Sequence, residues 1–101
     1  MKTVQTKQEI DALTSDHLVV VDAYADWCRP CKKVAPVLEE LEKKYESITF
    51  LKFDADECEE LAQEMGVTNL PTVFLFEPGE DVKKLVGDNV DRLRNEIEAM
   101  L

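Results

Sequence analysis

One apolar run constrains the fold of this chain more than any other feature. Residues 18–24 are β-branched, aliphatic or aromatic except for Asp22, which is the pattern of a strand covered on both faces in a parallel sheet. A second strand pattern at 48–54 follows a stretch, from Cys28 to Tyr45, in which apolar residues recur at intervals of three and four. Because a helix of this length can connect two parallel strands, the sequence predicts a right-handed βαβ unit.

Cap and turn signals divide the rest of the chain. The Thr-x-x-Glu spacing at Thr6 is a capping box, and Gly66 occupies a C-cap position after a short acidic helix. Pro78, Gly79 and Glu80 have the length of a hairpin turn, so the strands around them are expected to be antiparallel. The predicted order is strand 3–5, helix 6–13, strand 18–24, helix 28–45 with a kink at Pro36, strand 48–54, helix 57–65, strands 72–77 and 81–86, and helix 89–100. This order predicts an α/β fold, a central mixed β-sheet with helices on both faces.

Length and charge narrow the classes of protein. The 101 residues suit one domain, expected to span 1–101. With 22 acidic and 12 basic side chains the net charge is −10, which argues against nucleic acid or an anionic membrane as the main partner. The sequence has no signal-peptide pattern and no apolar run near ~18 residues, so a cytoplasmic protein is expected.

The acidity is uneven along the chain. Residues 1–50 carry seven basic and nine acidic groups, whereas residues 51–101 carry five and thirteen. The nearly neutral half contains a cationic cluster of Arg29, Lys32 and Lys33. We therefore expect a locally cationic site on an acidic body.

Two cysteines at positions 28 and 31 carry the clearest chemical signal. Cys28 and Cys31 can close a disulfide in the first turn of the predicted helix, and Pro30 suits that turn because its missing N–H is not needed. The helix dipole favours a thiolate at Cys28. Such a thiolate can attack a disulfide in another protein, and Cys31 can then displace the mixed disulfide.

Other uses of this cysteine pair are less well supported. A zinc site needs four ligands, and beyond the pair the chain offers only Cys58 and His17, so no metal is expected. A merely structural disulfide is a weak alternative because a four-residue loop restricts little chain entropy.

Motifs along the whole chain resemble those of the thioredoxin family. They are the segment VVDAYADWCRPCK at 20–32, Pro36, the Leu70-Pro71-Thr72 sequence, Gly79, and the Val86-Gly87 pair, in the family's order and at nearly its spacing. The resemblance implies the thioredoxin fold and a reversible dithiol/disulfide couple. It also implies disulfide-containing protein substrates and electron supply from a thioredoxin reductase, with no bound cofactor and a monomeric state.

Two polar residues apart from the cysteine pair are informative. A carboxylate inside an apolar central strand is expected to have a raised pKa, which would make Asp22 a proton acceptor, although a strand-end Asp facing water is an open alternative. By resemblance, Asp22 matches the family's buried aspartate, which helps to deprotonate the second cysteine. Lys52 matches a position where some thioredoxins keep a lysine near that aspartate, and a lysine extending to solvent is the alternative.

Three residues are expected to contact substrate. The resemblance implies that Pro71 is a cis proline beside the disulfide and that Leu70 offers backbone hydrogen bonds to an extended substrate. Trp27 is expected to present a flat apolar surface over the reactive sulfur, with ordinary core packing as the alternative.

Arg29 and Cys58 depart from the commonest or minimal pattern of the family. Glycine is commonest where this chain has Arg29, and a guanidinium there favours the Cys28 thiolate by ~1 kcal/mol. Since this stabilises the reduced form, we expect a weaker reductant than a glycine-bearing relative; a solvated arginine that contacts substrate is the alternative. Cys58 lies among carboxylates that disfavour its thiolate, so an unreactive thiol is expected.

The sequence leaves two further functions as alternatives to a protein-disulfide reductase. One is a disulfide oxidase or isomerase, which requires an oxidising compartment that nothing in the sequence indicates. The other is a binding module of the same fold in which the cysteines are incidental. The second is disfavoured because a binder needs none of the chemistry of Cys28, Cys31 and Asp22.

Overall fold

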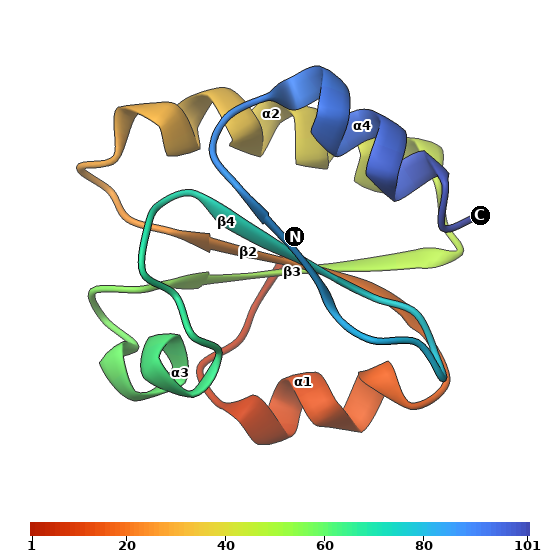
Figure 1. Cartoon of the computed structure of the whole chain (residues 1–101), viewed down its shortest axis with the longest axis horizontal. Helices are drawn as coiled ribbons and strands as arrows, with labels where there is room; N and C mark the ends of the chain where they lie inside the picture. The colour runs from red at the N-terminus through yellow and green to blue at the C-terminus, as the bar shows by residue number, and fades with distance from the viewer.

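Strand β2 (Leu18–Tyr24) lies at the centre of a five-stranded mixed sheet in this computed structural model, which describes residues 1–101. The strand order is β1-β3-β2-β4-β5, and helices cover both faces (Figure 1). The other elements are β1 (Lys2–Thr3), α1 (Lys7–Thr14), α2 (Arg29–Lys44), β3 (Ile48–Asp54), α3 (Glu59–Glu64), β4 (Thr72–Phe76), β5 (Lys83–Val86) and α4 (Val90–Glu98). The predicted α/β class and element order are confirmed.

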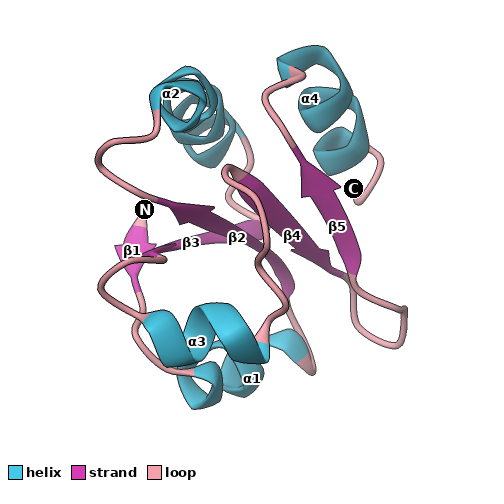
Figure 2. Cartoon of the chain, turned by 60° about the vertical axis from the view of Figure 1, so that its left-hand side comes forward, coloured by secondary structure: helices cyan, strands magenta, loops and turns pink.

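The directions of the strands follow from their connections. β2 runs parallel to β3, to which it is connected through α2, and antiparallel to β4. β4 and β5 are antiparallel across the turn that contains Gly79, whose φ of 79° suits a residue without a side chain. Helices α2 and α4 lie on one face of the sheet, and α1 and α3 lie on the other, as Figure 2 also shows.

Both central strands coincide with their predicted ranges, whereas the ends of several outer elements do not. The first strand is Lys2–Thr3 rather than 3–5, although the Val4 N–H still donates to the Lys52 carbonyl at 2.9 Å. Helix α3 begins only at Glu59, since Cys58 has non-helical backbone angles. The strand predicted at 81–86 begins at Lys83. At such edges fewer ladder hydrogen bonds and packing contacts define where an element ends.

The sheet separates two apolar cores. Because successive side chains of a strand point to opposite faces, Val20 packs towards α2 and α4 whereas Val19 and Val21 pack towards α1 and α3. The α2–α4 side holds 12 buried residues and the α1–α3 side holds 11, so both faces of β2 are covered as its apolar run predicts.

Side-chain caps precede α1 and α4. Thr6 accepts the Glu9 backbone N–H at 3.3 Å, and the Glu9 carboxylate accepts the Thr6 N–H at 3.1 Å, which confirms the predicted capping box. Asn89 Oδ1 accepts the Arg92 N–H and so caps α4, a cap that was not predicted. Pro36 lies inside α2 without ending it.

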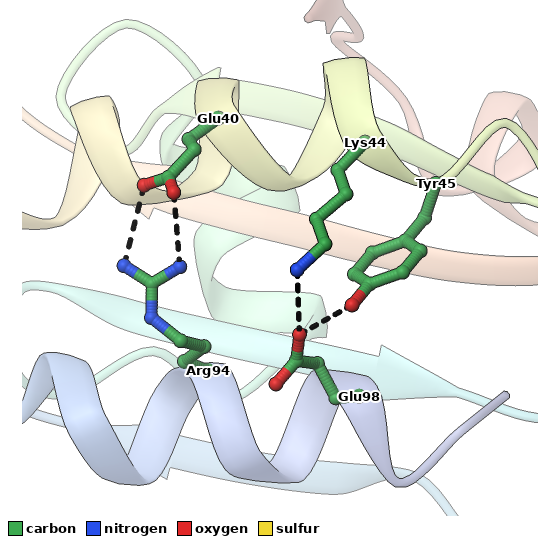
Figure 3. A network of polar contacts seen from close by, with 5 residues as sticks. All are labelled: Glu40, Lys44, Tyr45, Arg94 and Glu98. Atoms are coloured by element: carbon green, nitrogen blue, oxygen red, sulfur yellow. Dashed lines mark hydrogen bonds and ion pairs between the residues drawn. The ribbon is translucent and has the colours of Figure 1, made fainter.

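A network of polar contacts joins helices α2 and α4, which lie on the same face of the sheet (Figure 3). The Arg94 guanidinium donates to both carboxylate oxygens of Glu40 at 3.3 and 3.2 Å. Glu98 accepts a hydrogen bond from the Tyr45 hydroxyl and lies 3.6 Å from the Lys44 ammonium. These contacts align the two helices, and α2 carries the cysteine pair at its other end.

Candidate active site

Cys28 and Cys31 form a disulfide at the N-terminus of α2. Their Cα atoms are 5.3 Å apart, and Cys28 is the residue that caps the helix: its Sγ accepts the Cys31 backbone N–H at 3.2 Å. This hydrogen bond and the positive end of the helix dipole both favour negative charge on the Cys28 sulfur once the disulfide is reduced. Pro30 occupies the first turn of α2, as predicted.

Both cysteines are buried while the disulfide is closed. Cys28 is 2% exposed and Cys31 is 4% exposed, and both pack against Ala25 with Tyr24 and Leu70 around them. Neighbouring side chains therefore limit access to both sulfurs.

Trp27 is the large apolar residue most exposed beside the disulfide. It is 70% exposed, so ordinary core packing is wrong for this side chain. Its indole N–H donates to Asp56 Oδ2 at 2.6 Å, which holds the ring against the loop between β3 and α3. That loop is itself fixed, because Asp54 Oδ1 accepts the backbone N–H of Asp56 at 2.8 Å. The ring thus forms a fixed apolar surface next to Cys28.

The Leu70–Pro71 peptide bond is cis, which confirms the expectation for Pro71. Pro71 is buried and its carbonyl accepts the Gly87 N–H at 3.0 Å. An open groove of about 460 Å³ runs between Trp27 and Leu70 and is lined also by Ala55, Ala62, Val67, Thr68 and Asn69. Five of its seven lining residues are apolar, and one of them, Leu70, also packs against the cysteine pair, so the groove suits an extended peptide.

Asp22 is buried below the cysteine pair. It is 2% exposed, so the alternative of a water-facing strand-end residue is wrong. Its Oδ1 has no hydrogen-bond partner, and burial raises the pKa of this carboxyl to about 7, an increase that the positive charge of Lys52 partly offsets. Asp22 and Cys31 line the same cavity of about 120 Å³, and Lys52 pairs in register with Asp22 on β3.

The cationic cluster of Arg29, Lys32 and Lys33 is exposed at the start of α2. Lys33 lies 3.8 Å from the Asp88 carboxylate, whereas Arg29 forms no ion pair. Arg29 therefore presents a free guanidinium directly after Cys28. Its effect on the redox couple stays a prediction.

Cys58 is the remaining cysteine and lies away from the disulfide. It is half-buried at the N-terminus of α3, and burial first, then the nearby carboxylates of Glu57, Asp54 and Glu9, raise the pKa of its thiol. No group of three or more His, Cys, Asp or Glu side chains is placed to hold a metal ion. No helix combines the length and apolar character needed to cross a membrane.

Two residues near the site carried no usable signal in the sequence. Asp56 is one acid within an acidic stretch, and only the fold brings it to Trp27, 29 positions away. Tyr24 reads as an ordinary strand residue, yet its ring lies beside Lys52 in the cavity that contains Asp22. Contacts across such distances leave no local pattern.

Known proteins with similar sequences and structures agree with this geometry. Residues 1–99 match the thioredoxin family. The chain is 40% identical to thioredoxin-1 of Schizosaccharomyces pombe over 102 residues, covering 100% of this chain and 99% of that protein. It is 43% identical to thioredoxin-1 of Saccharomyces cerevisiae over 96 residues, covering 94% and 93%. The Fasciola hepatica thioredoxin structure superposes with a TM-score of 0.90 at 34% identity and full coverage of both chains.

A disulfide lies at the N-terminus of α2, and the same site contains a buried carboxyl group and a cis proline. This combination defines a thiol–disulfide oxidoreductase. Such a protein reduces disulfides by means of its own dithiol. The chain belongs to the thioredoxin family, and its function is that of a thioredoxin-type dithiol reductase.

Proposed function

We propose that Cys28 is the attacking thiol of this reductase and Cys31 the resolving thiol. The observation that carries this assignment is the difference between the two sulfurs. Cys28 Sγ accepts a backbone N–H at the helix N-terminus, whereas Cys31 lines the cavity that contains Asp22. One sulfur is thus arranged to be a thiolate, and the other has a proton acceptor nearby.

The reaction has two exchange steps. The Cys28 thiolate attacks one sulfur of the substrate disulfide; the substrate S–S bond breaks, and the departing thiolate takes a proton from water. Asp22 accepts the proton of Cys31, whose thiolate then attacks Cys28 Sγ. The mixed S–S bond breaks, and the second substrate sulfur leaves as a thiolate that takes up the proton held by Asp22. The substrate gains two electrons and two protons, and Cys28 and Cys31 become the disulfide.

Trp27, Leu70 and Pro71 form the proposed contact surface for the substrate. The exposed indole and the groove beside it bury apolar surface of an extended segment, and the Leu70 backbone offers hydrogen bonds to that segment. Arg29, Pro30 and Lys52 are proposed to tune the couple: Arg29 and the helix start act on Cys28, and Lys52 acts on Asp22.

Recycling requires a donor of two electrons for the Cys28–Cys31 disulfide, and a thioredoxin reductase is the proposed donor. The chain itself is proposed to act as a one-domain monomer, residues 1–101, in the cytoplasm and without a bound cofactor. Analytical ultracentrifugation tests the monomeric state, and a stable dimer would contradict it. Cell fractionation tests the cytoplasmic location, and a pool of the protein in an organelle would contradict it.

Insulin reduction with dithiothreitol as the donor tests the assignment. Cys28→Ser is expected to abolish turnover, and Cys58→Ser, a matched change away from the disulfide, is expected to retain it. Cys31→Ser is expected to trap mixed disulfides with substrate on Cys28. Failure of the wild-type protein to reduce insulin would instead favour a binding module. If mixed disulfides formed only in Cys28→Ser, on Cys31, then Cys31 would be the attacking thiol and Cys28 the resolving thiol.

A further inference from the structure

Lys52 has an unusual environment for a lysine close to a buried carboxyl group. The Lys52 residue is half-buried. Its ammonium donates no hydrogen bond to the protein and has no carboxylate oxygen within 4.0 Å. The contact that its ammonium does make is with the Tyr24 ring, whose centroid lies 5.8 Å away. We propose that Tyr24 is a positioning residue, whose ring holds the Lys52 ammonium at the Asp22 cavity and so sets the positive charge that Asp22 experiences.

The backbone brings these three side chains to one place. Asp22 and Tyr24 are two residues apart on β2 and therefore point to the same face of the sheet, and Lys52 is the register partner of Asp22 on β3. All three line the cavity of about 120 Å³ that also contains Cys31. The ring, the cation and the carboxyl group thus line one partly open cavity together with Cys31.

The face of an aromatic ring attracts a cation, because the ring carries a quadrupole. The contact with the Tyr24 ring thus favours the position of the Lys52 ammonium beside the cavity. Without the ring, the flexible Lys52 side chain is expected to extend its charge into water, where hydration is stronger. Asp22 would then lose part of its one attractive interaction with a cation, since its Oδ1 accepts no hydrogen bond.

Other charged groups lie close to these side chains and are not themselves altered by a change at Tyr24. The cavity is lined also by Asp26, Lys32, Glu39 and Met1, whose ammonium pairs with Glu42, and the carboxylates of Asp54 and Glu57 act on Tyr24. The contribution of the ring–ammonium contact is therefore the part of the change in the Asp22 pKa that disappears when Lys52 is also replaced.

The test is a titration of the Asp22 side-chain carboxyl carbon by NMR in the oxidised protein. Tyr24→Leu is expected to raise the pKa of Asp22 by roughly 0.5 to 1, because the positive charge of Lys52 would lie farther from the carboxylate. Tyr24→Phe keeps a ring and is expected to retain the wild-type value. In a Lys52→Met background, Tyr24→Leu is expected to change nothing further, because its effect runs through Lys52.

Three results would overturn this role for Tyr24. They are an unchanged or lowered pKa of Asp22 in Tyr24→Leu, a shift in Tyr24→Phe equal to that in Tyr24→Leu, and a shift of the same size with and without Lys52. Should Tyr24→Leu not fold, Tyr24→Met provides the same comparison. The inference draws on the role of Asp22 in the proposed function, but the titration needs no substrate. Failure of insulin reduction by the wild type would therefore contradict the proposed function and leave this result standing.

Discussion

Asp22 shows most clearly what one residue does in this molecule. It places a carboxyl group where β2 otherwise carries apolar side chains, and burial raises its pKa to about 7. Because the carboxyl group ionises at a lower pH in the unfolded chain than in the folded one, Asp22 costs stability from about pH 4 upward, and the cost is fully present above about pH 7. Its proposed role as the proton acceptor for Cys31 requires such a raised pKa.

Replacing Asp22 is expected to stabilise the protein increasingly as the pH rises from about 4 to about 7, and by a constant amount above that. Between an unfolded value of 3.8 and a folded value of about 7, the contribution of Asp22 to stability falls as pH rises, and above pH 7 the loss reaches about 4 kcal/mol. Asp22→Ala removes this loss. Urea unfolding at pH 4, 6 and 8 measures it, with the exposed Asp81→Ala as control. A pH profile of Asp22→Ala parallel to that of the wild type would contradict this account.

Arg29 is predicted to act on the redox couple. Its exposed guanidinium is expected to favour the reduced, anionic form of Cys28, so Arg29→Gly is expected to lower the reduction potential by up to about 20 mV. Equilibration with a glutathione buffer measures this potential. Arg29→Lys keeps the charge and is expected to behave like the wild type. An equal or higher potential in Arg29→Gly would rule out an electrostatic role for Arg29.

At the scale of elements, one helix start shows that the same residue can both cap a helix and carry the proposed reactive group. Thr6 and Asn89 cap α1 and α4 with side-chain oxygens, whereas α2 uses the sulfur of Cys28. The cap of α2 is therefore also the proposed attacking group, and the free N–H groups that a helix start must satisfy act on a reactive sulfur. At α3, the residue in the cap position is Cys58, whose side chain accepts no hydrogen bond from the helix.

Loss of the cap on α1 provides a test at this scale. Thr6→Ala removes the acceptor for the Glu9 backbone N–H, and the expected cost is about 1 kcal/mol of unfolding free energy. Thr14→Ala, in the last turn of the same helix, is the matched control and is expected to be nearly neutral. Guanidinium unfolding of both variants measures the difference. Equal stability of the two variants would show that the capping box contributes nothing.

At the scale of the whole molecule, α2 connects the site to the core. The helix packs on the sheet through Val34, Leu38 and Leu41, all fully buried, and its outer side is joined to α4 by the Glu40–Arg94 and Glu98 contacts. The position of the disulfide over Asp22 thus depends on packing several turns away from it.

Leu38→Ala tests this dependence. It leaves a cavity between α2 and the sheet and is expected to cost about 2–5 kcal/mol. Leu101→Ala makes the same change at an exposed position and is expected to lie within about 0.5 kcal/mol of the wild type. Thermal and denaturant unfolding compare the two. A loss below about 1 kcal/mol in Leu38→Ala would mean that α2 is held mainly by its surface contacts.

The two central strands and the cysteine motif could be predicted from local patterns. The ranges 18–24 and 48–54 coincide with β2 and β3 because strands covered on both faces need continuous apolar residues. The cap at Thr6 and the disulfide at 28 and 31 likewise depend on neighbours three residues apart. The limits of β1, α3 and β5 could not be predicted, because edge elements end where tertiary contacts stop.

The sequence by itself determined the strand–helix alternation, the helix caps and the spacing of the two cysteines, since each depends on side chains close together along the chain. Only the tertiary structure decided that Asp22 lies below Cys31, that Trp27 is tied to Asp56 and that Lys52 lies against Tyr24. The reason is physical: burial and charge act through space, and the residues concerned are brought together only when the sheet and α2 pack.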